Sequence, residues 1–152
     1  MALTKIADGG MPAGSVLQVV TSTTSTEVAN NTTNDVATGL SAAITPSSSS
    51  SKIFATATIP IQIGSNAGNI VVVYSLKRGS TVIATTPAKV NVNAIVQLHE
   101  SISISKVDSP STTSSTTYSV TFKETAQTSR YGSTLVCTDS TTATLTLMEI
   151  SA

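Results

Sequence analysis

The residues able to do acid–base or nucleophilic chemistry are one histidine, eight carboxylates, one cysteine and a large excess of serine and threonine. The histidine, His99, is followed by Glu100 in a segment of alternating apolar residues. Neighbouring side chains of a strand point to opposite faces, so these two cannot act as a pair. A serine–histidine–acid triad also needs a sharp nucleophile turn and an oxyanion hole, and the sequence lacks a Gly-x-Ser-x-Gly motif. We therefore predict no catalytic residue, and a surface or structural role for His99.

The carboxylates and the cysteine do not form a recognisable metal or cofactor site. The eight acids are scattered singly: Asp8, Glu27, Asp35, Glu100, Asp108, Glu124, Asp139 and Glu149. They lack calcium-loop spacing, and no glycine-rich phosphate loop is present in the sequence. A single cysteine, Cys137, allows neither an intrachain disulfide nor a cysteine-based zinc site, and its apolar neighbours predict a core position. We expect no metal, no cofactor and no enzyme.

Hydroxyl groups replace charge in the composition. Serine and threonine make up about a third of the 152 residues, whereas charged residues make up 11%, against about 25% in an average soluble domain. The chain has no basic excess with which to neutralise phosphates, so nucleic-acid binding is not expected. Its longest apolar run, residues 70–74, is far shorter than the roughly 20 residues that span a bilayer. Since residues 1–6 lack a signal-peptide pattern, we expect synthesis in a cytoplasm and no membrane insertion.

Apolar side chains at every second position indicate the fold class. Residues 53–63 alternate apolar and other side chains, as a strand with one buried face does. Residues 70–76 and 81–84 flank a Lys-Arg-Gly-Ser turn and predict a hairpin. Further strands are expected at 16–20, 40–44, 90–106, 118–122 and 141–150, and no capped helical stripe is present. The sequence thus predicts an all-β, antiparallel, jelly-roll-like β-sandwich over 15–152, preceded by a flexible, extended N-terminal arm over 1–14.

The positions between and along the predicted strands indicate which residues form loops, which are exposed and which are buried. Residues 47–51 and 111–117 are predicted to be solvated loops, since they contain nothing to bury. Lys77 and Arg78 in the hairpin turn are interpreted either as solvated cations or as a contact with an acidic partner. Tyr118 and Phe122 are expected in the core.

The poverty of aromatic residues, 3% of the chain, predicts a thin aliphatic core that a subunit interface completes. Four residues are candidates for that interface: Tyr131 and Arg130 in a polar stretch, and Met148 and Ile150 on the outward face of the last strand. We expect a homo-oligomer, with a trimer favoured, or a chain bound in a lattice of neighbours.

Several segments resemble a virion-surface structural module of marine bacteriophages that infect cyanobacteria and related bacteria. They are LTKI at 3–6, MPAGSVLQV at 11–19, TGLSAAITP at 38–46, SSKI at 50–53, LKRGSTVI at 76–83, DSP at 108–110, TTYSV at 116–120 and ATLTLMEI at 143–150. The resemblance implies a β-rich, non-enzymatic and often oligomeric domain, found at the ends of tail-fibre-like chains and as small stand-alone proteins. The resemblance assigns no catalytic residue to this chain.

The leading hypothesis is a capsid-exterior decoration or knob protein. It would bind other virion proteins through its N-terminal arm, with Leu3, Lys5, Ile6, Met11 and Pro12 as attachment residues, after synthesis in the host cytoplasm. The alternative is a tail-fibre or tail-spike tip domain that binds a host-surface receptor. Under that alternative alone, hydroxyl-rich loops would bind host glycans. A fibre also needs a shaft, and 14 residues precede the expected sandwich.

Overall fold

A computed structural model describes residues 11–127 and 134–152, with the backbone alone described at 65–67, 92–96 and 126–127. Within these ranges the chain forms eight strands and one short 3-10 turn. They are β1 (Val16–Thr24), β2 (Val28–Asn30), β3 (Val36–Ile44), β4 (Lys52–Arg78), β5 (Thr81–Asp108), β6 (Thr116–Gln127), β7 (Thr134–Val136), η2 (Thr138–Ser140) and β8 (Ala143–Ile150). No helix in this part of the chain is long and apolar enough to cross a membrane.

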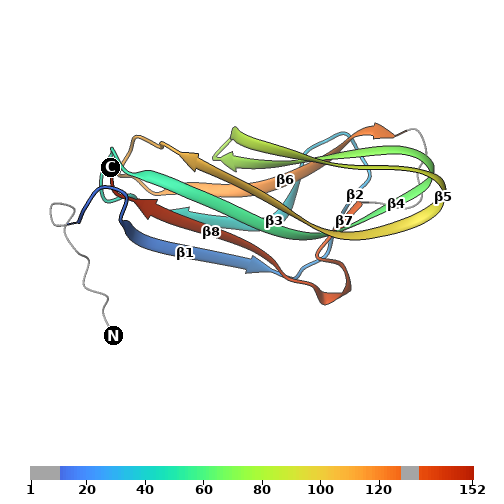
Figure 1. Cartoon of the computed structure of the whole chain (residues 1–152), viewed down its shortest axis with the longest axis horizontal. Helices are drawn as coiled ribbons and strands as arrows, with labels where there is room; N and C mark the ends of the chain where they lie inside the picture. The colour runs from blue at the N-terminus through green and yellow to red at the C-terminus, as the bar shows by residue number, and fades with distance from the viewer. Residues whose placement is uncertain (1–10, 128–133) are drawn as a thin grey trace.

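The β4–β5 hairpin is the longest element of the molecule. Its two strands pair from Arg78↔Thr81 at the tip to Ile53↔Asp108 at the base. Figure 1 shows both strands curving together at one end of the molecule and returning toward the other end. The pairing register shifts between Asn66 and Gly68, in the stretch between the two halves of the hairpin, and such a bulge lets a paired strand bend. Residues 53–63 and 70–76, predicted as separate strands, are therefore parts of one continuous strand.

The two halves of the bent hairpin belong to two different layers. The β8 sheet contains β1, β8, residues 52–58 of β4 and residues 103–108 of β5. The β6 sheet contains β3, β6, residues 70–78 of β4 and residues 81–90 of β5. All of these pairings are antiparallel, and β3 packs against β1 and β8. The predicted all-β antiparallel sandwich is confirmed.

A short break in the pairing accommodates Pro60. On one side of β4 the pairing with β8 ends at Thr58, and the pairing with β7 starts at Ile61. The Pro60 carbonyl oxygen accepts a hydrogen bond from the Cys137 backbone N–H at 3.1 Å. The N and C=O of a residue in an antiparallel strand point to the same side. The missing N–H of Pro60 therefore faces the turn at residues 137–141, where no ladder bond is lost.

The core lies between the sheets and is mostly aliphatic, as the alternation predicts. Ile53, Ala55, Ala57, Ile59 and Ile61 are buried at every second position of β4, and Leu145 and Leu147 repeat the pattern in β8. The β6 sheet adds three fully buried aromatic residues, Tyr74, Tyr118 and Phe122. Tyr74 stacks on Phe122 with ring centroids 5.8 Å apart. Core positions for Tyr118, Phe122 and Cys137 are thereby confirmed.

The tip of the bent hairpin is bonded to its own base. The Arg78 guanidinium at the tip donates hydrogen bonds to the two Asp108 carboxylate oxygens at 3.0 and 2.8 Å. The buried Tyr118 hydroxyl donates to the same carboxylate at 2.7 Å. Burial and the neighbouring Asp108 carboxylate both raise the pKa of Tyr118. We call these three side chains the hairpin lock, because they join strands that belong to the two sheets.

Both turn cations therefore have partners within the chain. Lys77 pairs with Asp35 at 2.9 Å, and Arg78 pairs with Asp108. This geometry favours the structural interpretation of both cations over a contact with an external acidic partner, and it shows that they are paired and not simply solvated.

Removal of the lock carboxylate should weaken the sandwich measurably. Asp108→Ala leaves a buried tyrosine hydroxyl and a half-buried guanidinium without their shared acceptor, so we expect the free energy of unfolding to fall by about 2–3 kcal/mol. Asp35→Ala is the matched control, because it removes the acid partner of the adjacent cation and should cost less than about 1 kcal/mol. Urea denaturation of both variants measures the difference. Equal losses in the two variants would show that the lock has no special role.

Candidate interaction surface

Residues 12–15 are hydrogen-bonded to the end of the chain. The Gly14 N–H donates to the Ser151 carbonyl oxygen at 3.0 Å, and the Ser151 N–H donates to the Ser15 carbonyl oxygen at 2.9 Å. The Ser151 hydroxyl donates to the Pro12 carbonyl oxygen at 2.8 Å and accepts from the Ser15 N–H at 3.0 Å. We call these contacts the terminal clamp, because they hold residues 12–15 against the C-terminal end of the chain.

Of the five predicted attachment residues, Met11 and Pro12 lie at the terminal clamp, with Met11 half-buried and Pro12 exposed. Leu3, Lys5 and Ile6 fall outside the described residues. Figure 1 places the start of β1 and the C-terminus at the same end of the sandwich, opposite the bend of the β4–β5 hairpin.

A buried carboxylate holds the serine-rich loop beside the clamp. Glu149 is fully buried and accepts hydrogen bonds from the Ser47 N–H and hydroxyl, both at 2.6 Å, and from the Gln18 amide at 2.5 Å. Burial by itself raises the pKa of Glu149, but the hydrogen bonds from Ser47 and Gln18 together outweigh burial and keep this pKa below its ordinary value. The loop at 47–51 is not merely solvated, because it supplies donors to a buried acid.

The outer face of the β8 sheet carries a row of apolar side chains that crosses four strands. Cross-strand pairing places Val19 of β1 next to Met148 of β8, Met148 next to Phe54 of β4, and Phe54 next to Val107 of β5. Val16 and Ile150 are paired beside this row. Three of the large hydrophobic residues that are exposed belong to this group: Val16 at 49%, Val19 at 56% and Val107 at 52%.

Two rows of hydroxyl groups continue the same face. Thr21, Thr146, Thr56 and Ser105 form one row, and Thr23, Thr144, Thr58 and Ser103 form the next. Lys52, paired with Ile150, adds a charge at one corner. The outer face of the β6 sheet differs, since Lys77, Lys89 and Lys123 lie on it. We call the apolar row and the two hydroxyl rows the uncharged face. An uncharged patch with apolar side chains at one end has the composition of a protein contact surface.

Two of the predicted interface residues lie on or next to the uncharged face. Met148 belongs to its apolar row and Ile150 lies beside that row, both half-buried, whereas Arg130 and Tyr131 fall outside the described residues. Sequence reasoning missed Val19, Phe54 and Val107. Each stands at an outward position of an alternating strand, but the alternation does not say which outward residues become neighbours across strands.

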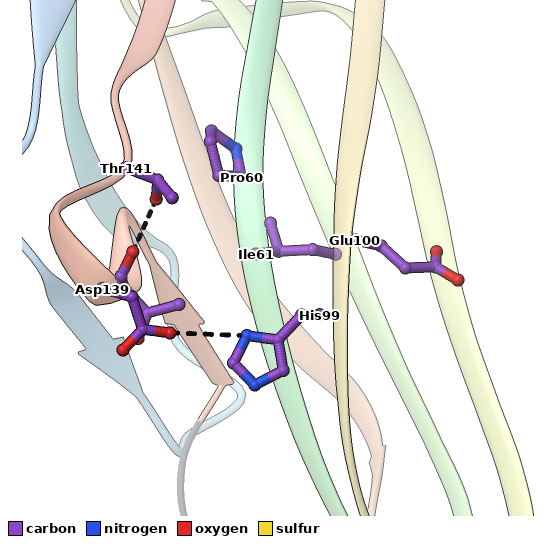
Figure 2. Close-up of a pocket in the computed structure, with 7 residues that line it drawn as sticks. Pro60, Ile61, His99, Glu100, Asp139 and Thr141 are labelled. Atoms are coloured by element: carbon purple, nitrogen blue, oxygen red, sulfur yellow. Dashed lines mark hydrogen bonds and ion pairs between the residues drawn. The ribbon is translucent and has the colours of Figure 1, made fainter.

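A pocket of about 220 Å³ lies at the far end of the β8 sheet, lined by Pro60, Ile61, His99, Glu100, Thr138, Asp139 and Thr141. In Figure 2 the His99 ring faces Asp139, whereas Glu100 points away from both. The His99 Nδ1 atom is 3.6 Å from an Asp139 carboxylate oxygen, and the side chains are 50% and 73% exposed.

The expected surface position of His99 is confirmed, and so is its separation from Glu100. Asp139 was not foreseen as its neighbour, because the two lie 40 residues apart in the sequence. A carboxylate beside Nδ1 fixes the orientation of an imidazole and leaves Nε2 free to accept a proton.

In the described residues, histidine, cysteine and acidic side chains do not gather in groups of three that could hold a metal ion.

Comparison with known proteins adds no family assignment. A scan against protein-family models finds no match to this chain, and a search of the curated proteins finds none either.

Neutralising Glu149 should lower stability in a pH-dependent way. Its folded-state pKa lies below the ordinary value of about 4.3, so the ionised carboxylate stabilises the fold above that pH, and this contribution is lost as the pH falls through the folded-state pKa. We expect Glu149→Gln to cost about 1–3 kcal/mol near pH 7. The variant should also lose less stability than the wild type between about pH 5 and pH 2.

Denaturation series at several pH values measure both effects. Glu27→Gln, which changes an exposed glutamate between β1 and β2, is the control and should match the wild type. Parallel pH profiles for the wild type and Glu149→Gln would contradict this role for the buried carboxylate.

Proposed function

We propose that this protein is a non-enzymatic structural protein of a bacteriophage particle, displayed on the capsid exterior and bound to other virion proteins through its N-terminal segment. The observation that carries the proposal is the terminal clamp. Its hydrogen bonds between residues 12–15 and Ser151 hold the root of the N-terminal segment at one end of the sandwich. A segment with a fixed root can lie in a groove or add a strand to a partner, while the sandwich projects away from it.

The resemblance of the strand and turn segments to virion-surface modules supports the same function. So does the low charge of the surface, since copies repeated closely on a particle would not repel one another. The hairpin lock and the buried Glu149 network are hydrogen bonds suited to a rigid module that keeps its shape when displayed.

Deletion of residues 1–10 tests the attachment role. The deletion spares Pro12, Gly14 and Ser15, so the terminal clamp and the sandwich should remain intact. We expect binding to particles that lack this protein to fall at least about tenfold, which corresponds to about 1.4 kcal/mol. The full-length chain with Ser49→Ala, a change in an exposed loop serine, is the control.

Undiminished binding by the deletion variant would refute attachment through the N-terminal segment. A host-adsorption assay gives the second readout, since a decoration protein added in solution should leave infection unchanged. Competition with infection would instead support a receptor-binding tip of a tail fibre or tail spike.

We further propose that neighbouring copies meet through the uncharged face, as a homo-oligomer or within the lattice of the particle. Four strands about 4.8 Å apart, with about six residues of each at about 3.3 Å per residue, cover roughly 380 Å² per copy. Two copies would bury about 760 Å² in total, below the usual range for a stable contact between free chains. Such a contact is weak between free chains and is strengthened by repetition on a particle.

A charge placed in the apolar row should break this contact. We expect Val19→Glu combined with Met148→Glu to reduce the mass measured by light scattering at high concentration to that of one chain. Val82→Glu is the control, because Val82 is a comparably exposed valine, 48%, at the tip of the hairpin. A wild type that stays monomeric at every concentration and does not pair on particles would overturn the proposal.

A further inference from the structure

Two contacts lie side by side at the pocket at the far end of the β8 sheet, and three of their four residues line it: His99, Thr138 and Asp139. The Thr138 hydroxyl is 3.5 Å from the Gln62 side-chain oxygen, and the Asp139 carboxylate is 3.6 Å from His99 Nδ1. Gln62 and His99 are paired across β4 and β5, so their side chains share one face of the sheet. Thr138 and Asp139 are consecutive residues. A hydroxyl, a primary amide, an imidazole and a carboxylate therefore meet at one place.

We propose that Thr138 and Gln62 react to form an intramolecular ester. The Thr138 Oγ1 atom attacks the Gln62 side-chain carbonyl carbon, Cδ, and forms a new C–O bond. The C–N bond of the amide then breaks, the hydroxyl proton is transferred to the departing nitrogen, and one molecule of ammonia leaves. No oxidant, reductant or co-reactant takes part, so the atoms balance within the two side chains.

His99 and Asp139 supply the proton transfer that this step requires. Asp139 is a positioning residue: its carboxylate oxygen lies 3.6 Å from His99 Nδ1 (Figure 2), and after a small side-chain movement it accepts the Nδ1 proton and orients the ring. The Nε2 atom of His99 takes the proton from Thr138 and delivers it to the leaving nitrogen, as the histidine of a serine–histidine–acid triad does. Rotation about the last side-chain bond of Gln62, a torsion with a broad range, turns the face of the amide carbonyl toward the hydroxyl so that Cδ can be attacked.

The turn that carries Thr138 is held in advance against β4. The Cys137 N–H donates to the Pro60 carbonyl oxygen at 3.1 Å, and the Thr141 hydroxyl donates to the Thr138 carbonyl oxygen at 2.6 Å. Thr138 itself is only 6% exposed, so water competes little for its hydroxyl. The hydroxyl is held 3.5 Å from the oxygen of the amide that it attacks, and a nucleophile positioned close to its target gains part of the rate advantage of an intramolecular reaction.

The same turn stores backbone strain. Cys137, Asp139 and Ser140 have φ values of 55°, 55° and 61°, in the left-handed region that residues other than glycine rarely adopt. Such strain persists only where surrounding contacts impose it, and it is concentrated at functional sites. Here it places two consecutive side chains, Thr138 and Asp139, against two paired residues of the sheet.

The linkage would join residues that are 76 positions apart in the chain. It would tie the turn before β8 covalently to β4, so β8 could not be pulled from the sheet without also moving the long hairpin. This property suits a domain displayed on the outside of a particle, but the chemistry does not depend on that location.

The mass of the intact wild-type chain tests the proposal directly. We expect the purified full-length protein to be lighter than its sequence by one ammonia molecule. Trypsin cuts after Lys52, Lys77 and Arg130, so peptides 53–77 and 131–152 should stay joined and should separate after treatment with hydroxylamine, which cleaves esters. An unmodified mass, or an ammonia loss confined to one asparagine, would overturn the proposal.

Variants identify the atoms involved. Thr138→Val and Gln62→Glu should each abolish the ammonia loss, whereas Thr138→Ser should retain it. Thr58→Val, which removes an exposed hydroxyl of the same sheet, is the matched control and should react fully. Full ammonia loss in Thr138→Val would refute Thr138 as the nucleophile. Because the wild-type mass alone decides whether the ester forms, a variant that fails to fold does not leave the proposal untested.

His99→Ala should slow ester formation by about 10²-fold or more, as expected for loss of a general base. Asp139→Asn should also slow it, and Asp139→Glu should restore much of the rate, as expected for a group that orients the imidazole. An unchanged rate in His99→Ala would show that another group transfers the proton.

Discussion

The sandwich depends on a single long hairpin that is bent double. Because β4 and β5 supply strands to both sheets, the layers are connected along the chain at the bend and through side chains at the opposite end. There Arg78, Asp108 and Tyr118 join the hairpin tip to its base. β8 and β1 pair onto one half of the hairpin, and β6 and β3 onto the other. This charge-assisted contact adds to the buried core in holding the two halves of the hairpin together.

Hydrogen bonds between polar groups stabilise both ends of the sandwich that the hairpin forms. At the end that holds the termini, Ser151 and the buried Glu149 tie together segments from the start, the middle and the end of the sequence. At the other end, the strained turn at 137–140 fills the gap that Pro60 leaves in the pairing of β4. The hydroxyl-rich composition contributes to both, since serine and threonine supply compact donors that bond to backbone oxygens and carboxylates without adding charge.

Much of the fold could be predicted from local pattern. The alternation at 53–63 identifies a half-buried strand, and Gly79, whose φ is 55°, occupies the turn expected between 76 and 81. The continuity of β4 could not be predicted, because residues 64–68 interrupt the alternation and resemble a loop. Only pairing with β5 keeps that stretch extended. The anchoring of Ser47 was missed for a related reason, since its partner, Glu149, lies 102 residues away in the sequence.

In the candidate surfaces too, local sequence pattern predicts some positions, whereas others depend on residues that are distant in the sequence. Outward positions for Met148 and Ile150 follow from the period of the last strand alone. Their neighbours Val19, Phe54 and Val107 depend on cross-strand register, which the bulge between Val16 and Gln18 alters further. The contact between Gln62 and Thr138 has no sequence signal, since a glutamine and a threonine are ordinary in this composition and only the turn conformation brings them together.

Strand β5 also limits how copies of this protein can associate. It runs for 28 residues as the outer strand of both layers and, within the described structure, pairs with β4 alone. An open strand of this length would normally invite another chain to extend the sheet into a fibre. Pro87 cannot donate to such a ladder, Lys89 and Lys106 put exposed positive charges along it, and the bend divides it into two differently directed halves. These features make it difficult for another chain to extend either sheet at this edge.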